Sequence, residues 1–277
     1  MKKRVIFGVV GLIFVLLALY RFPPIVLEAA LAALSALATY ELLGSTRLVR
    51  DRVMLALAVV YSLTYAFSLS TMAKAQPYSA MLSHILLTVF LLALFARLLQ
   101  KHATVGAQEA ACAAFGGICL PYLLLSLIRI FQIPQIGPFL VLLPLVAAWG
   151  SDTCALFAGI LFGKHKLAPV VSPKKTVEGA VGGVVGATVI MLAVVAVFNR
   201  FTPVDIPFFA AAVLGAVGAV IGQLGDLTFS VIKRQTGIKD YGNLIPGHGG
   251  VLDRFDSLTM VAPLMEALLL ILPLIRL

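Results

Sequence analysis

Residues 177–198 read VEGAVGGVVGATVIMLAVVAVF and contain a single charged side chain, Glu178. A helix needs about 20 apolar residues to cross the roughly 30 Å hydrocarbon core of a bilayer, and this stretch has that length and composition. Similar runs recur along the 277 residues, of which 61% are hydrophobic and 12% charged. Ordinary soluble domains have about 45–50% apolar and about 25% charged residues. The composition therefore excludes a soluble globule or a disordered chain and favours a protein embedded in lipid.

The apolar runs are separated by short polar breaks, and they predict an all-α integral membrane protein. We expect about nine transmembrane helices, at residues 5–20, 25–43, 53–71, 78–98, 107–131, 138–162, 177–198, 206–230 and 252–275. The longest polar segments, 163–176 and 231–250, both lie in the second half. We therefore predict an N-terminal multispanning region, residues 1–135, and a C-terminal catalytic membrane region, residues 136–277, which carries these two loops.

The distribution of Lys and Arg predicts the orientation of the chain. With nine spans and an inside N-terminus, sixteen of the 21 basic residues fall on the cytoplasmic side and five on the other. Cytoplasmic loops of membrane proteins carry such an excess. We expect a multi-pass protein of the cell inner (cytoplasmic) membrane, with a cytoplasmic N-terminus, a C-terminus on the opposite side and both polar loops in the cytoplasm. The net charge of +9 then indicates anionic headgroups and nucleotides as partners, and no nucleic acid.

The first half has few polar side chains in or near its spans: Glu28, Glu41, His84, Glu109 and Arg129. Polar groups in such positions form structural contacts or reach towards the interface more often than they catalyse. We expect a structural role for these five residues. Function is then to be sought in the second half.

Two predicted helices of the second half place charged side chains on one face each. Asp226, Ser230 and Lys233 are spaced i, i+4 and i+7, whereas Asp253 and Asp256 are spaced i and i+3. Three carboxylates are thus expected to converge at the cytoplasmic interface.

Converging carboxylates repel one another unless a cation lies between them. Mg²⁺ prefers oxygen ligands and is often shared between one or two carboxylates and a substrate phosphate. We predict a magnesium site made by Asp226, Asp253 and Asp256, with room for a second cation, divalent or K⁺. The alternative is that Asp226 pairs with Lys233, and Asp253 with Arg254, only to stabilise the helix ends.

The segment Pro246-Gly247-His248-Gly249-Gly250 precedes the last predicted helix. Glycines allow backbone conformations that direct successive N–H groups at an anion, and a helix N-terminus attracts negative charge. We predict a phosphate site that acts through these N–H groups; in the alternative, His248 protonates the leaving group, or the loop is a simple flexible turn. The countercharge for a triphosphate would come from Lys233, Arg234, Lys239 and Arg254.

The stretch from Ser230 to Asp256 resembles the signature of the phosphatidate cytidylyltransferase family, also called CDP-diglyceride synthetases. The matching residues are Ser230, Ile232, Lys233, Arg234, Lys239, Asp240, Gly242, Ile245, Pro246, His248, Gly249, Gly250, Val251, Asp253, Arg254, Phe255 and Asp256. The resemblance extends upstream through residues 172–179 and 162–167 to 151–153. This sequence departs from the pattern at Cys154, Leu156 and Ile160, where Gly, Tyr and Arg are common.

The resemblance implies an enzyme that transfers a cytidylyl group from CTP to phosphatidate in phospholipid biosynthesis, giving CDP-diacylglycerol and pyrophosphate. It also suggests a homodimer. The residues it implies for catalysis are Asp226, Lys233, Arg234, Lys239, His248, Asp253 and Asp256. The residues it implies for substrate binding are Ser230, Lys174, Lys175, Asp240, Gly249, Gly250 and Arg254.

Two other classes of function are compatible with some of these features. An ion-coupled transporter could use Asp152, Glu109 and Asp226 along a pathway, and another metal-dependent lipid phosphotransferase would also need carboxylates. Clustering of the charges at one interface, and the order of the motif, favour the cytidylyltransferase. Asp152 lies deep in its predicted span, and it is expected either to join the metal site or to pair with a hydroxyl or basic group. Ser172-Pro173 predicts the start of a helix, with Ser as the N-cap.

Overall fold

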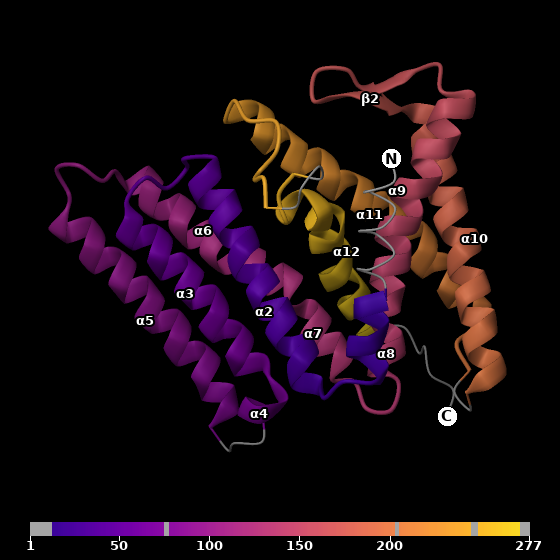
Figure 1. The fold of residues 1–277 in the computed structure, drawn as a ribbon, viewed down its shortest axis with the longest axis horizontal. Helices are drawn as coiled ribbons and strands as arrows, with labels where there is room; N and C mark the ends of the chain where they lie inside the picture. Colours follow the sequence, from indigo (N-terminus) through magenta and orange to yellow (C-terminus); the bar gives the residue numbers. More distant parts are fainter. Residues whose placement is uncertain (1–12, 75–77, 203–204, 245–248, 272–277) are drawn as a thin grey trace. The chain divides into compact units, whose positions relative to one another are not determined.

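The computed structural model describes residues 13–74, 78–202, 205–244 and 249–271 (Figure 1). Two compact units are formed, Met1–Pro134 with Gln235–Arg254, and Gln135–Arg234 with Phe255–Leu277. Residues 13–20 are helical. The elements that follow are α2 (Pro24–Tyr40), the π-helix η1 (Glu41–Ser45), α3 (Arg52–Leu69), α4 (Thr71–Lys74), α5 (Ser79–Gln100), α6 (Ala107–Leu124), α7 (Ser126–Phe131), α8 (Gly137–Leu140), α9 (Leu142–Phe162), β1 (Lys166–Ala168), β2 (Ser172–Thr176), α10 (Val177–Phe201), α11 (Phe208–Gln235) and α12 (Leu252–Ile271).

Seven helices among the described residues are long and apolar enough to cross a membrane. They coincide with the second to eighth spans that the sequence predicts. Residues 5–12 of the first predicted span lie outside the described residues, and residues 13–20 are helical. The last corresponds to α12, which is not among these seven helices. A multispanning helical architecture is therefore confirmed for the middle of the chain.

The first unit is built on α2, α3, α5 and α6, which pack side by side (Figure 1). Two of its carboxylates, the partly exposed Glu109 and the buried Glu28, accept hydrogen bonds from backbone N–H groups. Glu109 accepts from the N–H groups of Arg50 and Asp51, at 2.5 and 2.6 Å. Glu28 accepts from the N–H of Thr71 at 2.9 Å. These contacts confirm a structural role for both glutamates.

In the second unit, α9 and α10 approach closely because small residues face one another. A Cβ atom on Gly182 would collide with Ala158, and one on Gly186 would collide with Cys154. Small residues at such interfaces allow two helices to pack without the bulk of large side chains. The tight contact fixes how the ends of α9 and α10 sit together.

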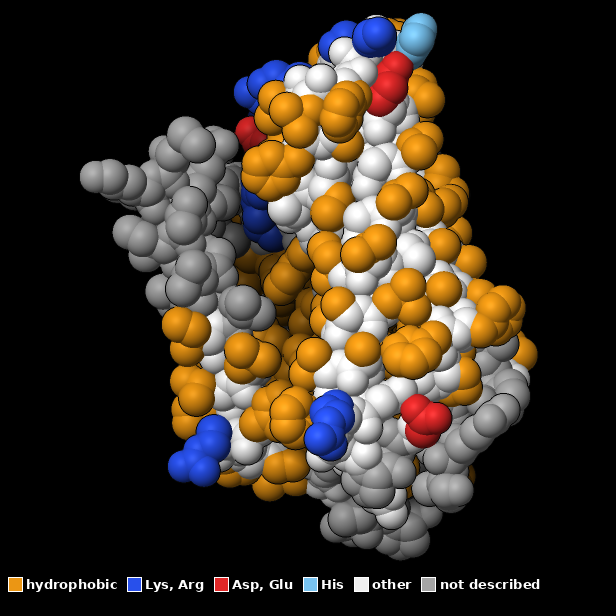
Figure 2. Space-filling model, turned by 90° about the vertical axis from the view of Figure 1, so that its right-hand side faces the viewer, with side chains coloured by type: hydrophobic (Ala, Val, Ile, Leu, Met, Phe, Trp, Pro, Cys, Tyr) orange, Lys and Arg blue, Asp and Glu red, His pale blue; other side chains and the backbone are white. Residues whose placement is uncertain are grey.

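The two faces of α10 differ in a way that suits a lipid environment. Its buried residues follow an i, i+4 pattern: Gly179, Gly183, Ala187, Met191 and Val195. Its exposed valines follow the same pattern along another stripe: Val177, Val181, Val185, Val189 and Val197. Figure 2 shows hydrophobic side chains over the middle of this part of the molecule, with charged side chains towards both ends and most of them at the end that carries the strands. We interpret the valine stripe as a lipid-facing surface.

The polar segment between α9 and α10 forms a two-stranded antiparallel hairpin, in which Lys166 pairs with Thr176. The predicted helix start at Ser172-Pro173 is therefore wrong, because these residues belong to β2. Thr176 is the N-cap instead, since its side chain accepts a hydrogen bond from the N–H of Gly179 at 3.1 Å. The hairpin is a small exception to the all-α class.

Candidate active site

The hairpin is held against the start of α10 by Glu178. Its carboxylate accepts hydrogen bonds from the N–H groups of Lys164 and His165, and it pairs with Nδ1 of His165 at 2.6 Å. The N–H of Val177 also donates to the carbonyl of His165 at 2.9 Å. These contacts fix β2, which carries Lys174 and Lys175, at the end of the helix pair.

A cavity of about 370 Å³ lies beneath this hairpin. The polar residues that line it are Asp152, Lys174, Lys175, Thr176, Gln223 and Asp226, and the others are Ala155, Leu156, Gly159, Ile160, Leu167, Gly179 and Ala180. Leu156 and Ile160 are 61% and 71% exposed, as expected for apolar side chains that face lipid. The cavity thus combines charged groups of both signs with apolar surface, which suits an amphipathic anionic ligand.

Asp226 and Lys175 form an ion pair in the wall of the cavity, and both side chains are mostly buried. The hydroxyl of Ser230, one turn further along α11, donates to Oδ1 of Asp226 at 3.4 Å. Nε2 of Gln223 donates to the carbonyl of Ala180 at 3.0 Å. A carbonyl can only accept, so this bond determines which way the Gln223 amide is turned.

Asp152 and Asp256 meet at one serine within the same unit. The hydroxyl of Ser257 donates to Oδ2 of Asp152 at 2.9 Å, and its N–H donates to Oδ1 of Asp256 at 2.8 Å. Asp256 is 7% exposed and interacts electrostatically with Asp226, Asp152 and the buried Lys233. Asp152 therefore has a hydroxyl partner, one of the two expectations for it. The shared contact with Ser257 also brings Asp152 near Asp256, one of the predicted metal ligands.

In the first unit, the described end of the predicted phosphate loop is bound by the carboxylate of Asp253. Oδ2 of Asp253 accepts hydrogen bonds from the N–H groups of Tyr241 and Gly250, at 2.7 and 3.0 Å. Gly249 has a φ of +84°, a conformation that favours glycine. In this structure the N–H of Gly250 is therefore engaged by Asp253. His248 lies outside the described residues.

The remaining predicted residues are distributed over both units. Lys239 and Asp240 are exposed in the segment after α11, and Arg254 is exposed in the first turn of α12. Nε of Arg234 donates to the carbonyl of Val171, at the hairpin, at 3.2 Å. The second unit brings together Lys174, Lys175, Asp226, Ser230, Lys233 and Asp256, whereas the first unit holds Lys239, Asp240, Gly249, Gly250, Asp253 and Arg254.

The described residues contain no group of three or more His, Cys, Asp or Glu side chains arranged to hold a metal ion. The predicted set of Asp226, Asp253 and Asp256 is thus not seen as a formed site, and Asp253 instead accepts hydrogen bonds from the N–H groups of Tyr241 and Gly250. In the second unit Asp256 interacts electrostatically with Asp226 and Asp152. Carboxylate oxygens are ligands that Mg²⁺ prefers, and this ion is commonly held by one or two carboxylates together with substrate phosphates.

The fold and this cavity define a multispanning helical protein with a charged site suited to an amphipathic anion. The model of the cytidylyltransferase family matches residues 2–272, and the chain belongs to this family.

Its relatives include the phosphatidate cytidylyltransferase of Staphylococcus saprophyticus, which is 39% identical over 158 residues, or 57% of this chain and 59% of the relative. The enzyme of Bacillus subtilis is 40% identical over 157 residues, with 57% and 55% covered. That of Haemophilus influenzae is 45% identical over 130 residues, with 47% and 45% covered. The chain thus matches about half of the length of these relatives.

Proposed function

We propose that the protein transfers a cytidylyl group from CTP to phosphatidate, giving CDP-diacylglycerol and pyrophosphate. The observation that carries this proposal is the cavity, which is lined by Lys174, Lys175 and Asp226 and by the exposed apolar side chains of Leu156 and Ile160. An anionic headgroup matches the lysines, and acyl chains match the apolar side. Membership of the cytidylyltransferase family supports the nucleotide half of the reaction.

The proposed reaction needs no covalent intermediate between the protein and the substrate. The phosphate of phosphatidate is already an anionic nucleophile, so catalysis requires that its oxygen lie in line with the α-phosphorus of CTP. Lys174 and Lys175 would hold the lipid phosphate, while Lys233, Arg234 and Lys239 would bind the triphosphate.

A divalent cation would complete the charge balance at the site. The ligands proposed for Mg²⁺ are those that the sequence predicts, Asp226, Asp253 and Asp256. When bound, Mg²⁺ would neutralise charge that develops on the departing pyrophosphate. A second cation, divalent or K⁺, remains part of the proposal because several carboxylates and a triphosphate offer enough oxygen ligands.

The proposed setting is the inner membrane, with nine spans, a cytoplasmic N-terminus and the active site facing the cytoplasm. The sixteen-to-five division of Lys and Arg supports this orientation. The basic hairpin and the cavity would then lie on the side where CTP is available. The homodimer, which the family resemblance suggests, belongs to the same proposal.

Detergent-purified protein should be incubated with phosphatidate, CTP labelled in the cytidine ring and Mg²⁺. We expect label in the lipid phase only when all three components are present. Diacylglycerol in place of phosphatidate should give none, because it lacks the nucleophilic phosphate. Labelling of lipid from diacylglycerol, or in the presence of EDTA, would contradict the proposal.

A further inference from the structure

The end of α2 is joined to the start of α12 through one carboxylate, that of Glu41. Glu41 begins the π-helical turn η1 that ends α2, and its side chain is 5% exposed. Its Oε1 accepts from the N–H of Val251 at 2.9 Å, and its Oε2 accepts from the N–H of Leu252 at 2.7 Å. A residue of the first half of the chain, where few polar side chains occur, therefore stabilises the start of α12, 210 positions later in the chain.

Two glycines of the loop leave room for this carboxylate. A Cβ atom on Gly250 would lie 2.5 Å from Oε2 of Glu41, and one on Gly242 would also collide with the carboxylate. These positions need glycine for close approach. The loop and the glutamate thus fit one another in shape as well as in hydrogen bonding.

Together, two carboxylates bind the N–H groups of three consecutive residues. Asp253 accepts from Gly250, and Glu41 accepts from Val251 and Leu252. Negative charge is favourable at a helix N-terminus, and these N–H groups have no partner within the helix itself. The pair of carboxylates therefore determines where α12 begins and holds Gly250, Val251 and Leu252 in place.

We propose that Glu41 is a positioning residue, which holds Gly250, Val251 and Leu252 in the arrangement that the use of CTP requires. This inference rests on the proposed function. Glu41 acts through the loop, since its oxygens are directed at backbone N–H groups. Transfer reactions are sensitive to small displacements of the groups that orient a substrate, so loss of one Glu41 bond is expected to affect the use of CTP.

The test compares Glu41→Gln with Glu28→Gln. Both glutamates are buried in the same continuous helix and accept backbone N–H groups, but Glu28 contacts Thr71 and Gln132, remote in sequence from the loop. Glutamine keeps the volume and one acceptor oxygen. We expect Glu41→Gln to lower kcat/KM for CTP roughly 10- to 100-fold while KM for phosphatidate stays at the wild-type value. Glu28→Gln should change neither constant.

Hydrogen exchange provides a readout that does not depend on turnover. The amides of Val251 and Leu252 should exchange faster in Glu41→Gln than in the wild-type protein, and they should not change in Glu28→Gln. An unaltered kcat/KM for CTP in Glu41→Gln would overturn the inference, as would an equal loss in Glu28→Gln or unchanged exchange. If the wild type makes no labelled lipid, the proposed function fails, and the exchange data still decide whether Glu41 holds the loop.

A second variant covers the case in which Glu41→Gln does not fold. Gly250→Ala places a methyl group against the carboxylate, so it should reproduce the loss in kcat/KM for CTP. In Glu41→Ala/Gly250→Ala the space left by the glutamate accommodates the methyl, and the combined loss should be smaller than the product of the two single losses. Independent, multiplicative losses would contradict a direct contact between these residues.

Discussion

Lys175 and Asp226 neutralise one another in a cavity wall that an anionic substrate would share. A phosphate bound beside Lys175 would compete with Asp226 for the ammonium, whereas a cation bound at Asp226 would compete with Lys175. The ion pair thus couples the binding of a phosphate at Lys175 to the binding of a cation at Asp226, and the proposed reaction needs both. Asp256, mostly buried and close enough to interact with Asp226, adds the negative charge that a divalent cation would offset.

Asp226→Asn and Asp256→Asn should each lower kcat by roughly 100-fold or more, because asparagine keeps the volume but removes the charge that would bind the cation. Thermal unfolding in detergent should change little. The matched control is Asp205→Asn, an exposed carboxylate in the same unit outside the cavity, which should retain full activity. Near wild-type rates for both Asp226→Asn and Asp256→Asn would make these carboxylates structural.

Sequence alone identifies some of these side chains and misses others for a physical reason. Asp226, Lys233 and Asp256 stand out because charge is costly in apolar helices and their spacing is regular. Glu41 stands out only as a polar residue in an apolar span. Its partners are backbone N–H groups more than 200 positions away, and no local pattern encodes such a contact.

Helix ends and turns follow local chemistry less closely than the spans do. Ser172-Pro173 has the composition of a helix start, but the chain continues as β2 up to Thr176. The tertiary contacts of Glu178 with Lys164 and His165 fold the segment back on itself, and Thr176 then provides a cap. The interior of α10 was predictable because about 20 apolar residues allow few alternatives in lipid.

The start of α3 gives an element whose stability should depend on pH. Asp51 caps the helix through the N–H groups of Val53 and Met54, and hydrogen bonds from the Arg97 guanidinium lower the pKa of Asp51. The folded-state pKa lies below the unfolded value, so this stabilisation is present above about pH 4 and is lost as the pH falls through the folded pKa.

Asp51→Asn should therefore lower Tm at pH 7, although asparagine can still cap a helix. The difference from the wild type should shrink as the pH is lowered below about 4. Scanning fluorimetry in detergent across this range measures it. A difference in Tm that stays constant with pH would show that the charge of Asp51 does not contribute.

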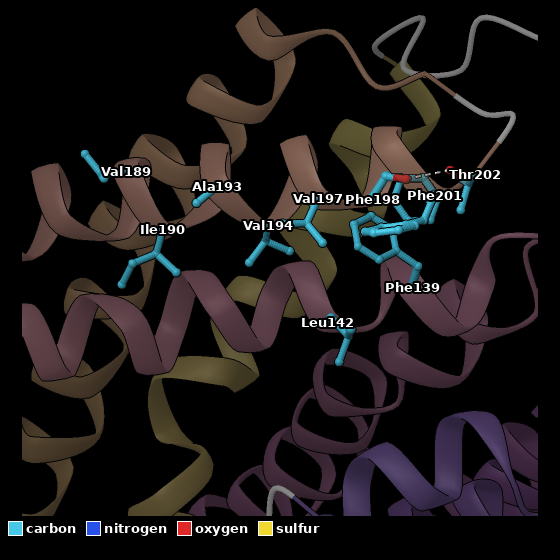
Figure 3. A pocket seen from close by; sticks show the side chains of 10 residues that line it. All are labelled: Phe139, Leu142, Val189, Ile190, Ala193, Val194, Val197, Phe198, Phe201 and Thr202. Atoms are coloured by element: carbon cyan, nitrogen blue, oxygen red, sulfur yellow. Dashed lines mark hydrogen bonds between the residues drawn. The ribbon is translucent and has the colours of Figure 1, made fainter.

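The chain as a whole combines a multispanning scaffold with charged side chains in both of its units. The hairpin and α11 provide the cavity of the second unit, and in the first unit Glu41 binds the N–H groups of Val251 and Leu252. A second cavity, of about 560 Å³, lies along α10 away from the hairpin (Figure 3). Phe139 and Phe198 stack there with ring centroids 3.6 Å apart, and its described lining is apolar except for Thr202. It offers no chemistry for the reaction.

The proposed orientation predicts a labelling pattern for the intact cell. Single cysteines at Ser172 and Thr236, in a background that lacks Cys112, Cys119 and Cys154, should react with an impermeant thiol reagent only after the cells are opened. A cysteine at Thr202 should react in intact spheroplasts. The reverse pattern would place the candidate site on the side of the membrane that lacks CTP.

The position of the label in CTP tests cytidylyl transfer most directly. Purified protein with phosphatidate and Mg²⁺ should be given CTP labelled at either the α- or the γ-phosphorus, and the lipid and aqueous phases counted separately. Transfer of the cytidylyl group carries the α-label into the lipid and releases the γ-label as pyrophosphate. We expect lipid label from α-labelled CTP alone, in equal amount to the pyrophosphate formed. Lipid label from γ-labelled CTP would indicate a kinase and contradict the proposed function.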